Sequence, residues 1–133
     1  MINNIDKVDK MLHSSYEAKM LYFSCAYFGE EVTIIFEDND IYNNIYKMMN
    51  CYKTNISHIV DYAKNKPYRD MEKNQIPFRL NDWNVVIEDG LYKINLTAHP
   101  LYLEFWCKDI QLDQMKKEEM DNFISNNSSN LLK

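Results

Sequence analysis

The clearest alternation of apolar and polar positions lies in residues 83–96, on the two sides of Asp89-Gly90. This dipeptide suits the centre of a type I′ turn, where both residues need a positive φ. Pairing the flanks through the turn puts three apolar pairs on one face: Trp83 with Leu96, Val85 with Ile94, and Ile87 with Tyr92. Slipping the register by one residue would move every member to the other face, so turn and pattern agree. The stretch predicts an antiparallel hairpin with one buried face.

Two further stretches alternate in the same way. After His99-Pro100, a third strand is predicted by the apolar positions Leu101, Leu103, Phe105 and Cys107. Earlier in the chain, Gly29-Glu30 has glycine at the first centre of a type II′ turn. That turn would pair Tyr27 with Val32, Cys25 with Ile34, and Phe23 with Phe36. Each hairpin has an apolar face to bury, so we expect the two to pack as a small sandwich or half-barrel.

The two predicted helices lie at the ends of the chain. Asn3 or Asn4 can cap a helix within residues 1–14 whose inward stripe is Ile5, Val8 and Leu12. Asp113 can cap a second helix over 113–125, followed by a frayed tail over 126–133. The inward side of that second helix would carry Met115, Met120, Phe123 and Ile124. Residues 64–74 are polar, contain a proline and predict a surface loop.

Residues 41–52 fit either a helix or a long, bent strand, and their aromatic and β-branched content favours the strand. The prediction is therefore a mainly β (α+β) fold in one domain, residues 1–133. It has an antiparallel core over residues 16–112 and short helices at both ends.

Length and charge exclude several classes of protein. The apolar runs are too short for a membrane span of about 20 residues, and the first ten residues do not form a secretory signal. Three cysteines without paired spacing do not predict a disulfide framework, so we expect a soluble, cytoplasmic protein. The net charge of −5 has the wrong sign for general phosphate binding. Neither a nucleic-acid nor a membrane partner is predicted.

A search for catalytic or metal-binding residues finds no constellation. Both glycines are assigned to hairpin turns, so none is left for a phosphate-cradling loop or a nucleophile elbow. His13, His58 and His99 lack metal-ligand spacing, although His58 and His99 could meet an acid across the fold. Cys25 and Cys107 fall on predicted core faces, and Cys51 has no electropositive neighbours that would make it a nucleophile. We expect no catalytic residue, metal or cofactor.

The best candidate for a binding surface is the acidic turn formed by Glu37, Asp38, Asn39 and Asp40. Such a turn is either an ordinary solvent-exposed hairpin turn or an acidic patch that binds a basic partner. Tyr42 and Tyr46 follow it, and tyrosine is favoured at protein interfaces because its ring packs while its hydroxyl stays wet. The hypothesis is a partner-binding site at Glu37, Asp38, Asp40, Tyr42 and Tyr46.

Three segments carry a resemblance to a known group of proteins: EVTIIFED (31–38), QIPF (75–78) and HPLYLEFWCKDI (99–110). With them, the chain resembles small cytoplasmic proteins of Gram-positive bacteria that are encoded beside polymorphic, wall-associated toxins and are taken to be immunity proteins. The resemblance implies a non-catalytic module that binds and neutralises a toxin domain.

Two other functions are open at this point. One is a β domain that binds a small molecule in a cavity between its sheets. The other is an enzyme whose site is scattered over several strands. The negative charge and the missing catalytic motifs favour the protein-binding module.

Overall fold

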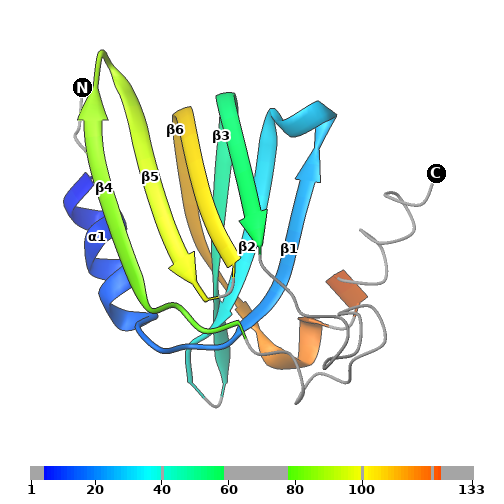
Figure 1. The fold of residues 1–133 in the computed structure, drawn as a ribbon. Helices are drawn as coiled ribbons and strands as arrows, with labels where there is room; N and C mark the ends of the chain where they lie inside the picture. The colour runs from blue at the N-terminus through cyan, green and yellow to red at the C-terminus, as the bar shows by residue number, and fades with distance from the viewer. Residues whose placement is uncertain (1–4, 40, 59–77, 100, 121, 124–133) are drawn as a thin grey trace, which may run out of the picture.

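The computed structural model describes residues 5–39, 41–58, 78–99, 101–120 and 122–123, which form one curved antiparallel sheet with short helices (Figure 1). The elements are α1 (Ile5–Ser14), β1 (Met20–Ala26), the 3₁₀ turn η1 (Tyr27–Gly29), β2 (Glu31–Glu37), β3 (Tyr42–His58), β4 (Asp82–Glu88), β5 (Leu91–Ala98) and β6 (Leu101–Lys116). The six strands lie in the order β1-β2-β3-β6-β5-β4. The predicted mainly β class with short helices is confirmed.

The β4–β5 hairpin has the predicted register. Trp83 pairs with Leu96, Val85 with Ile94, and Ile87 with Tyr92. Asp89 and Gly90 have φ values of 54° and 77°, as a type I′ turn requires. The alternation of β6 is also confirmed, because Leu101, Leu103, Phe105 and Cys107 are all buried.

The β1–β2 hairpin differs from the predicted register by two residues. Cys25 pairs with Val32 and Phe23 with Ile34, so the apolar face is kept although each predicted partner was wrong. The loop is wider than a two-residue turn, since Ala26 and Glu31 form its last strand pair. Tyr27, Phe28 and Gly29 all have positive φ, and the Glu30 N–H donates to the carbonyl of Tyr27 at 3.1 Å. A two-residue slip preserves the faces, so the hydrophobic pattern could not detect it.

Residues 42–52 are strand, as predicted, within the 17-residue β3. Residues 43–49 of β3 pair with β2, and the strand pairs with β6 along nearly its whole length. A β-bulge interrupts that ladder between Cys51 and Lys53, next to Asn50, whose φ is 55°. Bulges bend strands and increase their twist. The two hairpins consequently belong to one curled sheet rather than two stacked ones, and their apolar faces share one core.

Backbone bonds near the start of β1 bring the sheet edges together. The N–H of Leu80 donates to the carbonyl of Ala18 at 3.1 Å, and the N–H of Met20 donates to the carbonyl of Phe78 at 2.9 Å. One residue further on, the N–H of Asn81 donates to the carbonyl of Thr97 at 2.8 Å. The segment before β4 therefore hydrogen-bonds to the start of β1 and to β5, and so links both edges of the sheet.

Helix α1 packs beside β4 (Figure 1). Val8 and Leu12 are buried in the core cluster, as the predicted stripe required. On the solvent side, the indole N–H of Trp83 donates to Asp9 Oδ1 at 2.9 Å. The proposed caps Asn3 and Asn4 lie outside the described residues, as do the predicted loop over 64–74 and the tail over 126–133.

The C-terminal helix begins later than predicted. Asp113 is not its cap, because Asp113 pairs with Ile45 and β6 continues to Lys116. The helix starts at residue 117. Met120 is buried, and the ring of Phe123 packs edge-on against Tyr22 at 5.5 Å between centroids. The backbone hydrogen bonds between β6 and β3 extend the strand through Asp113, although an aspartate can also cap the start of a helix. No helix in the described part of the chain is long and apolar enough to cross a membrane.

Candidate functional site

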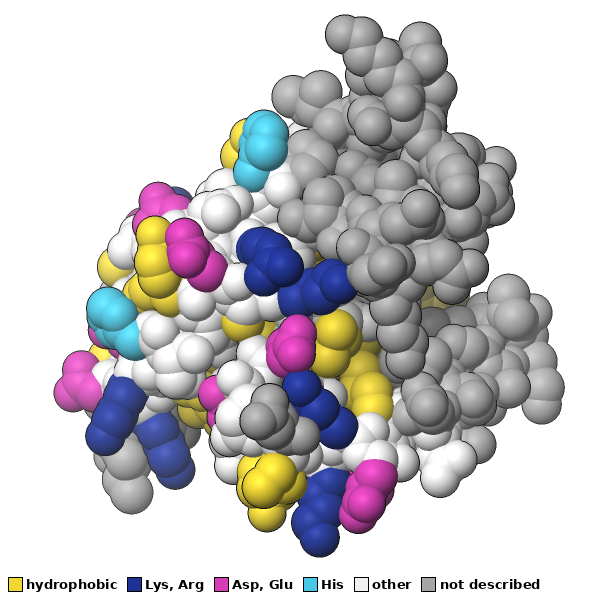
Figure 2. All heavy atoms as spheres, turned by 90° about the horizontal axis from the view of Figure 1, so that it is seen from below, with side chains coloured by type: hydrophobic (Ala, Val, Ile, Leu, Met, Phe, Trp, Pro, Cys, Tyr) yellow, Lys and Arg dark blue, Asp and Glu magenta, His cyan; other side chains and the backbone are white. Residues whose placement is uncertain are grey.

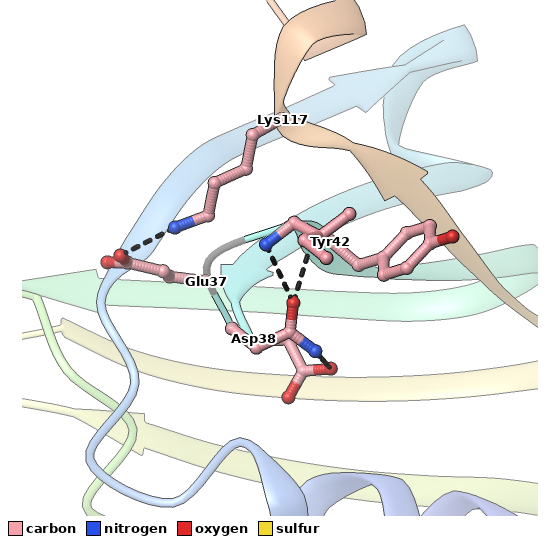
Figure 3. A network of polar contacts seen from close by, with 6 residues as sticks. Glu37, Asp38, Tyr42 and Lys117 are labelled. Atoms are coloured by element: carbon pink, nitrogen blue, oxygen red, sulfur yellow. Dashed lines mark hydrogen bonds and ion pairs between the residues drawn. The ribbon is translucent and has the colours of Figure 1, made fainter.

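The turn between β2 and β3 contains the sequence-predicted site. Its shape is held by Asn39, whose Oδ1 accepts hydrogen bonds from the backbone N–H groups of Ile41 (2.8 Å) and Tyr42 (2.9 Å) (Figure 3). Asparagine commonly stabilises turns in this way. The side chain of Tyr42 is half-buried beside it.

The acids of this turn already have partners within the chain. Glu37 Oε1 lies 3.0 Å from the Lys117 ammonium (Figure 3), and Asp38 Oδ2 accepts from the Gln114 amide at 3.2 Å. Asp40 lies outside the described residues. Seen from this end, basic and acidic side chains are interspersed rather than gathered by sign (Figure 2). The turn offers local carboxylates, but among the described residues it does not form a broad acidic patch.

Tyr46 does not belong to a surface, which corrects the sequence hypothesis. Its side chain is 2% exposed, its ring packs edge-on against Phe36 at 5.8 Å, and its hydroxyl lies 2.7 Å from Ser15 Oγ. Position 46 shares the inward face of β3 with the buried Asn44 and Met48. Burial raises the pKa of the Tyr46 phenol well above its usual range.

A chain of hydrogen bonds connects this buried tyrosine to the turn. The Asn44 amide donates to Ser15 Oγ at 3.2 Å, and Asn44 Oδ1 accepts from the Gln114 amide at 3.0 Å. Gln114 in turn donates to Asp38. The network satisfies buried polar groups and holds Asp38 against β6.

A second surface lies at the other end of β2, where η1 faces the bulge of β3. It encloses an open hollow of about 600 Å³. The lining residues are Tyr27, Phe28, Gly29, Glu30, Cys51, Tyr52, Lys53 and Thr54. Three of them, Tyr27, Phe28 and Tyr52, are exposed aromatic residues, which we call the aromatic rim. Sequence reasoning missed this rim, because it placed Tyr27 on the apolar face of the first hairpin and did not include Tyr52 in the proposed binding site.

Two contacts attach η1 to β3 beneath the rim. Thr54 Oγ1 donates to the carbonyl of Gly29 at 3.0 Å, and the Cys51 N–H donates to the carbonyl of Glu30 at 2.9 Å. Both bonds join backbone groups of the loop to β3, at Cys51 where the bulge begins and at Thr54 just beyond it. The loop and the bulge are therefore one connected structure.

The three thiols lie near this hollow and are free. Cys51 stands opposite Cys107 in the β3–β6 ladder. A hydrogen bond from the Cys107 thiol lowers the pKa of Cys51, whereas the same bond and burial raise the pKa of Cys107. Burial also raises the pKa of Cys25. Of the three, Cys51 lines the hollow and Cys107 is fully buried.

The three histidines make different contacts in the fold. His99 Nδ1 lies 3.0 Å from the Tyr102 hydroxyl, and His13 stacks edge-on against Trp83 at 4.8 Å. His58 pairs through its backbone with Leu101. Within the described ranges, no three His, Cys, Asp or Glu side chains are grouped closely enough to hold a metal ion.

Another hollow, of about 460 Å³, lies between α1 and the end of β6. Met11 and Leu112 supply apolar lining, and Lys7 and Lys10 stand at its side. Both hollows open to solvent.

Comparison with known proteins identifies a family and a solved structure of related fold. A family described as "Immunity protein PIM7" matches residues 2–114. No curated protein matches the chain. A crystal structure of an uncharacterized protein from Neisseria gonorrhoeae superposes with a TM-score of 0.53 at 12% identity, over 74% of this chain and 91% of that one. At this identity the likeness concerns the fold alone.

Proposed function

This chain belongs to the immunity protein PIM7 family, and we propose that it neutralises a cognate toxin by binding it and occluding its site. The observation that carries the proposal is the family match over residues 2–114, which includes α1, most of the sheet and both surfaces described above. A protein that covers the site of a toxin needs a stable binding surface, but it needs no catalytic residues of its own. Membership of an immunity family likewise favours a non-enzymatic role.

We place the complex in the cytoplasm and expect a basic toxin domain as partner. Three free thiols suit a reducing compartment. A net charge of −5 favours encounter with a cationic surface, such as that of an enzyme that holds phosphate groups.

The acidic turn retains a proposed role in this encounter. Glu37, Asp38 and Asp40 would attract the toxin, and the half-buried Tyr42 would supply contact area. Tyr46 is no longer part of the proposal, because it is buried.

The function is tested by co-expression. Cells that express the toxin gene adjacent to the gene of this chain should grow only when this chain is also produced, and the purified pair should co-elute and bind at a surface. Failure of the wild-type protein both to protect and to bind would exclude the immunity function. The matched control is a non-cognate toxin, which should neither bind nor be neutralised.

A further inference from the structure

We propose that the aromatic rim is the centre of the toxin-binding surface and that its hollow receives a basic side chain, arginine or lysine, from the toxin. The inference rests on the proposed immunity function and gives it a site and a contact chemistry.

The three aromatic side chains of the rim are exposed at one place. Phe28 is 112% exposed, Tyr27 68% and Tyr52 71%, and all three line the same hollow. Large apolar side chains gathered at one exposed place commonly mark an interaction site. Aromatic residues are also the residues that most often dominate the binding energy of protein interfaces.

The backbone of the rim is strained at Tyr27 and Phe28. Tyr27 and Phe28 have φ values of 53° and 59°, which are unfavourable for bulky residues that have a Cβ. Such strain persists only where the surrounding structure imposes it, and it is frequent at functional sites. Here the hydrogen bonds of Thr54 and Cys51 to the loop impose it. The rim is therefore ordered before binding, which lowers the entropic cost of association.

The aromatic rings and the carboxylate of Glu30 favour a positively charged side chain in the hollow. Faces of Phe and Tyr rings attract cations, arginine most often. Glu30 lines the same hollow, is exposed and forms no ion pair with any described residue. Lys53 is the one cation of the same lining. An arginine or lysine side chain that enters the hollow would therefore meet aromatic ring faces and the unpaired carboxylate of Glu30.

Substitution at the rim tests the proposal with the purified toxin. Phe28→Asn removes the ring, and asparagine tolerates a positive φ, so the loop keeps its conformation. We expect the affinity to fall at least about tenfold, mainly through faster dissociation. Glu30→Gln should reduce affinity several-fold and weaken its dependence on salt. The control Tyr16→Asn removes an exposed ring (55% exposed) next to Trp83 and should change affinity less than about twofold.

Alkylation of Cys51 provides an independent measurement. In a Cys25→Ala background, iodoacetamide should modify Cys51 and spare the buried Cys107. Toxin bound over the hollow should slow this reaction at least about fivefold. Thermal midpoints of all variants, measured without toxin, show whether each remains folded.

The outcomes separate the two proposals. Wild-type protein that neither binds nor protects would remove the immunity function, and this inference with it. If the wild type binds while folded Phe28→Asn keeps its affinity and Cys51 stays reactive, the function stands and the rim is overturned as its site. Loss of affinity together with protection of Cys51 supports the rim.

Discussion

The hydroxyl of Tyr46 lies 2.7 Å from Ser15 Oγ and joins β3 to the residue that follows α1. Both side chains are buried, and Asn44 donates to the same serine oxygen. The bond therefore fixes the helix against the sheet from the inside. It also explains why a tyrosine at this position serves the core and not an interface.

Tyr46→Phe should lower the free energy of unfolding by roughly 1 kcal/mol, because it removes one buried hydrogen bond while keeping the ring against Phe36. Urea unfolding followed by circular dichroism measures the change. Tyr52→Phe, which changes an exposed tyrosine, is the matched control and should be neutral. A midpoint for Tyr46→Phe equal to the wild type would mean that the hydroxyl contributes nothing to stability.

The same tyrosine should make the protein sensitive to alkali. Its pKa in the folded state is raised above the ordinary value of 10.0, mainly by burial, so above pH 10 the unfolded chain loses a proton that the folded chain retains. Stability is then fully present below about pH 10 and decreases as pH rises towards the folded-state pKa. Melting temperatures measured between about pH 9 and 11 should fall less steeply for Tyr46→Phe than for the wild type. If the melting temperatures of the two proteins fell equally steeply with pH, Tyr46 would not be the cause of the sensitivity to alkali.

Gly90→Val should destabilise the domain by more than about 1 kcal/mol, since Gly90 has a φ of 77° and a β-branched residue strongly disfavours this conformation. A Cβ at this position would meet no atom within 4 Å, so the cost comes from the backbone and not from a clash. Gly90→Asn is the control and should cost much less, because asparagine tolerates positive φ. Denaturant midpoints of the two variants that coincide would rule out this explanation.

Reversal of charge at the acidic turn tests the proposed steering. Asp38→Lys should slow association with the toxin about two- to fivefold at low ionic strength, and the difference should shrink at high salt. Glu88→Lys, on the exposed end of β4, changes the net charge equally and serves as the control. Association rates that fall equally for both variants would assign the effect to net charge and not to the turn.

Local patterns in the sequence determined much of this structure. The Asp89-Gly90 turn, the alternation on both sides of it and the stripe of α1 each specify their own conformation, because a period of two or 3.6 residues sorts side chains onto one face. The apolar positions Val32, Ile34 and Phe36 were correctly predicted to lie in a strand, and so were residues 42–52. The resemblance of three sequence segments to immunity proteins was confirmed by the family match.

Other features required the tertiary structure. The register of β1 with β2 depends on a loop whose positive φ values are imposed by contacts from Thr54 and Cys51, which lie more than twenty residues away. The pairing of β3 with β6 extends β6 past Asp113, and Tyr46 on β3 lies in the core. Tyr27 and Phe28 lie in the loop and are exposed. Sequence alone determined which residues alternate. The tertiary structure decided which face of each strand is buried and where each strand ends. The reason is that both depend on the neighbouring strands with which it pairs.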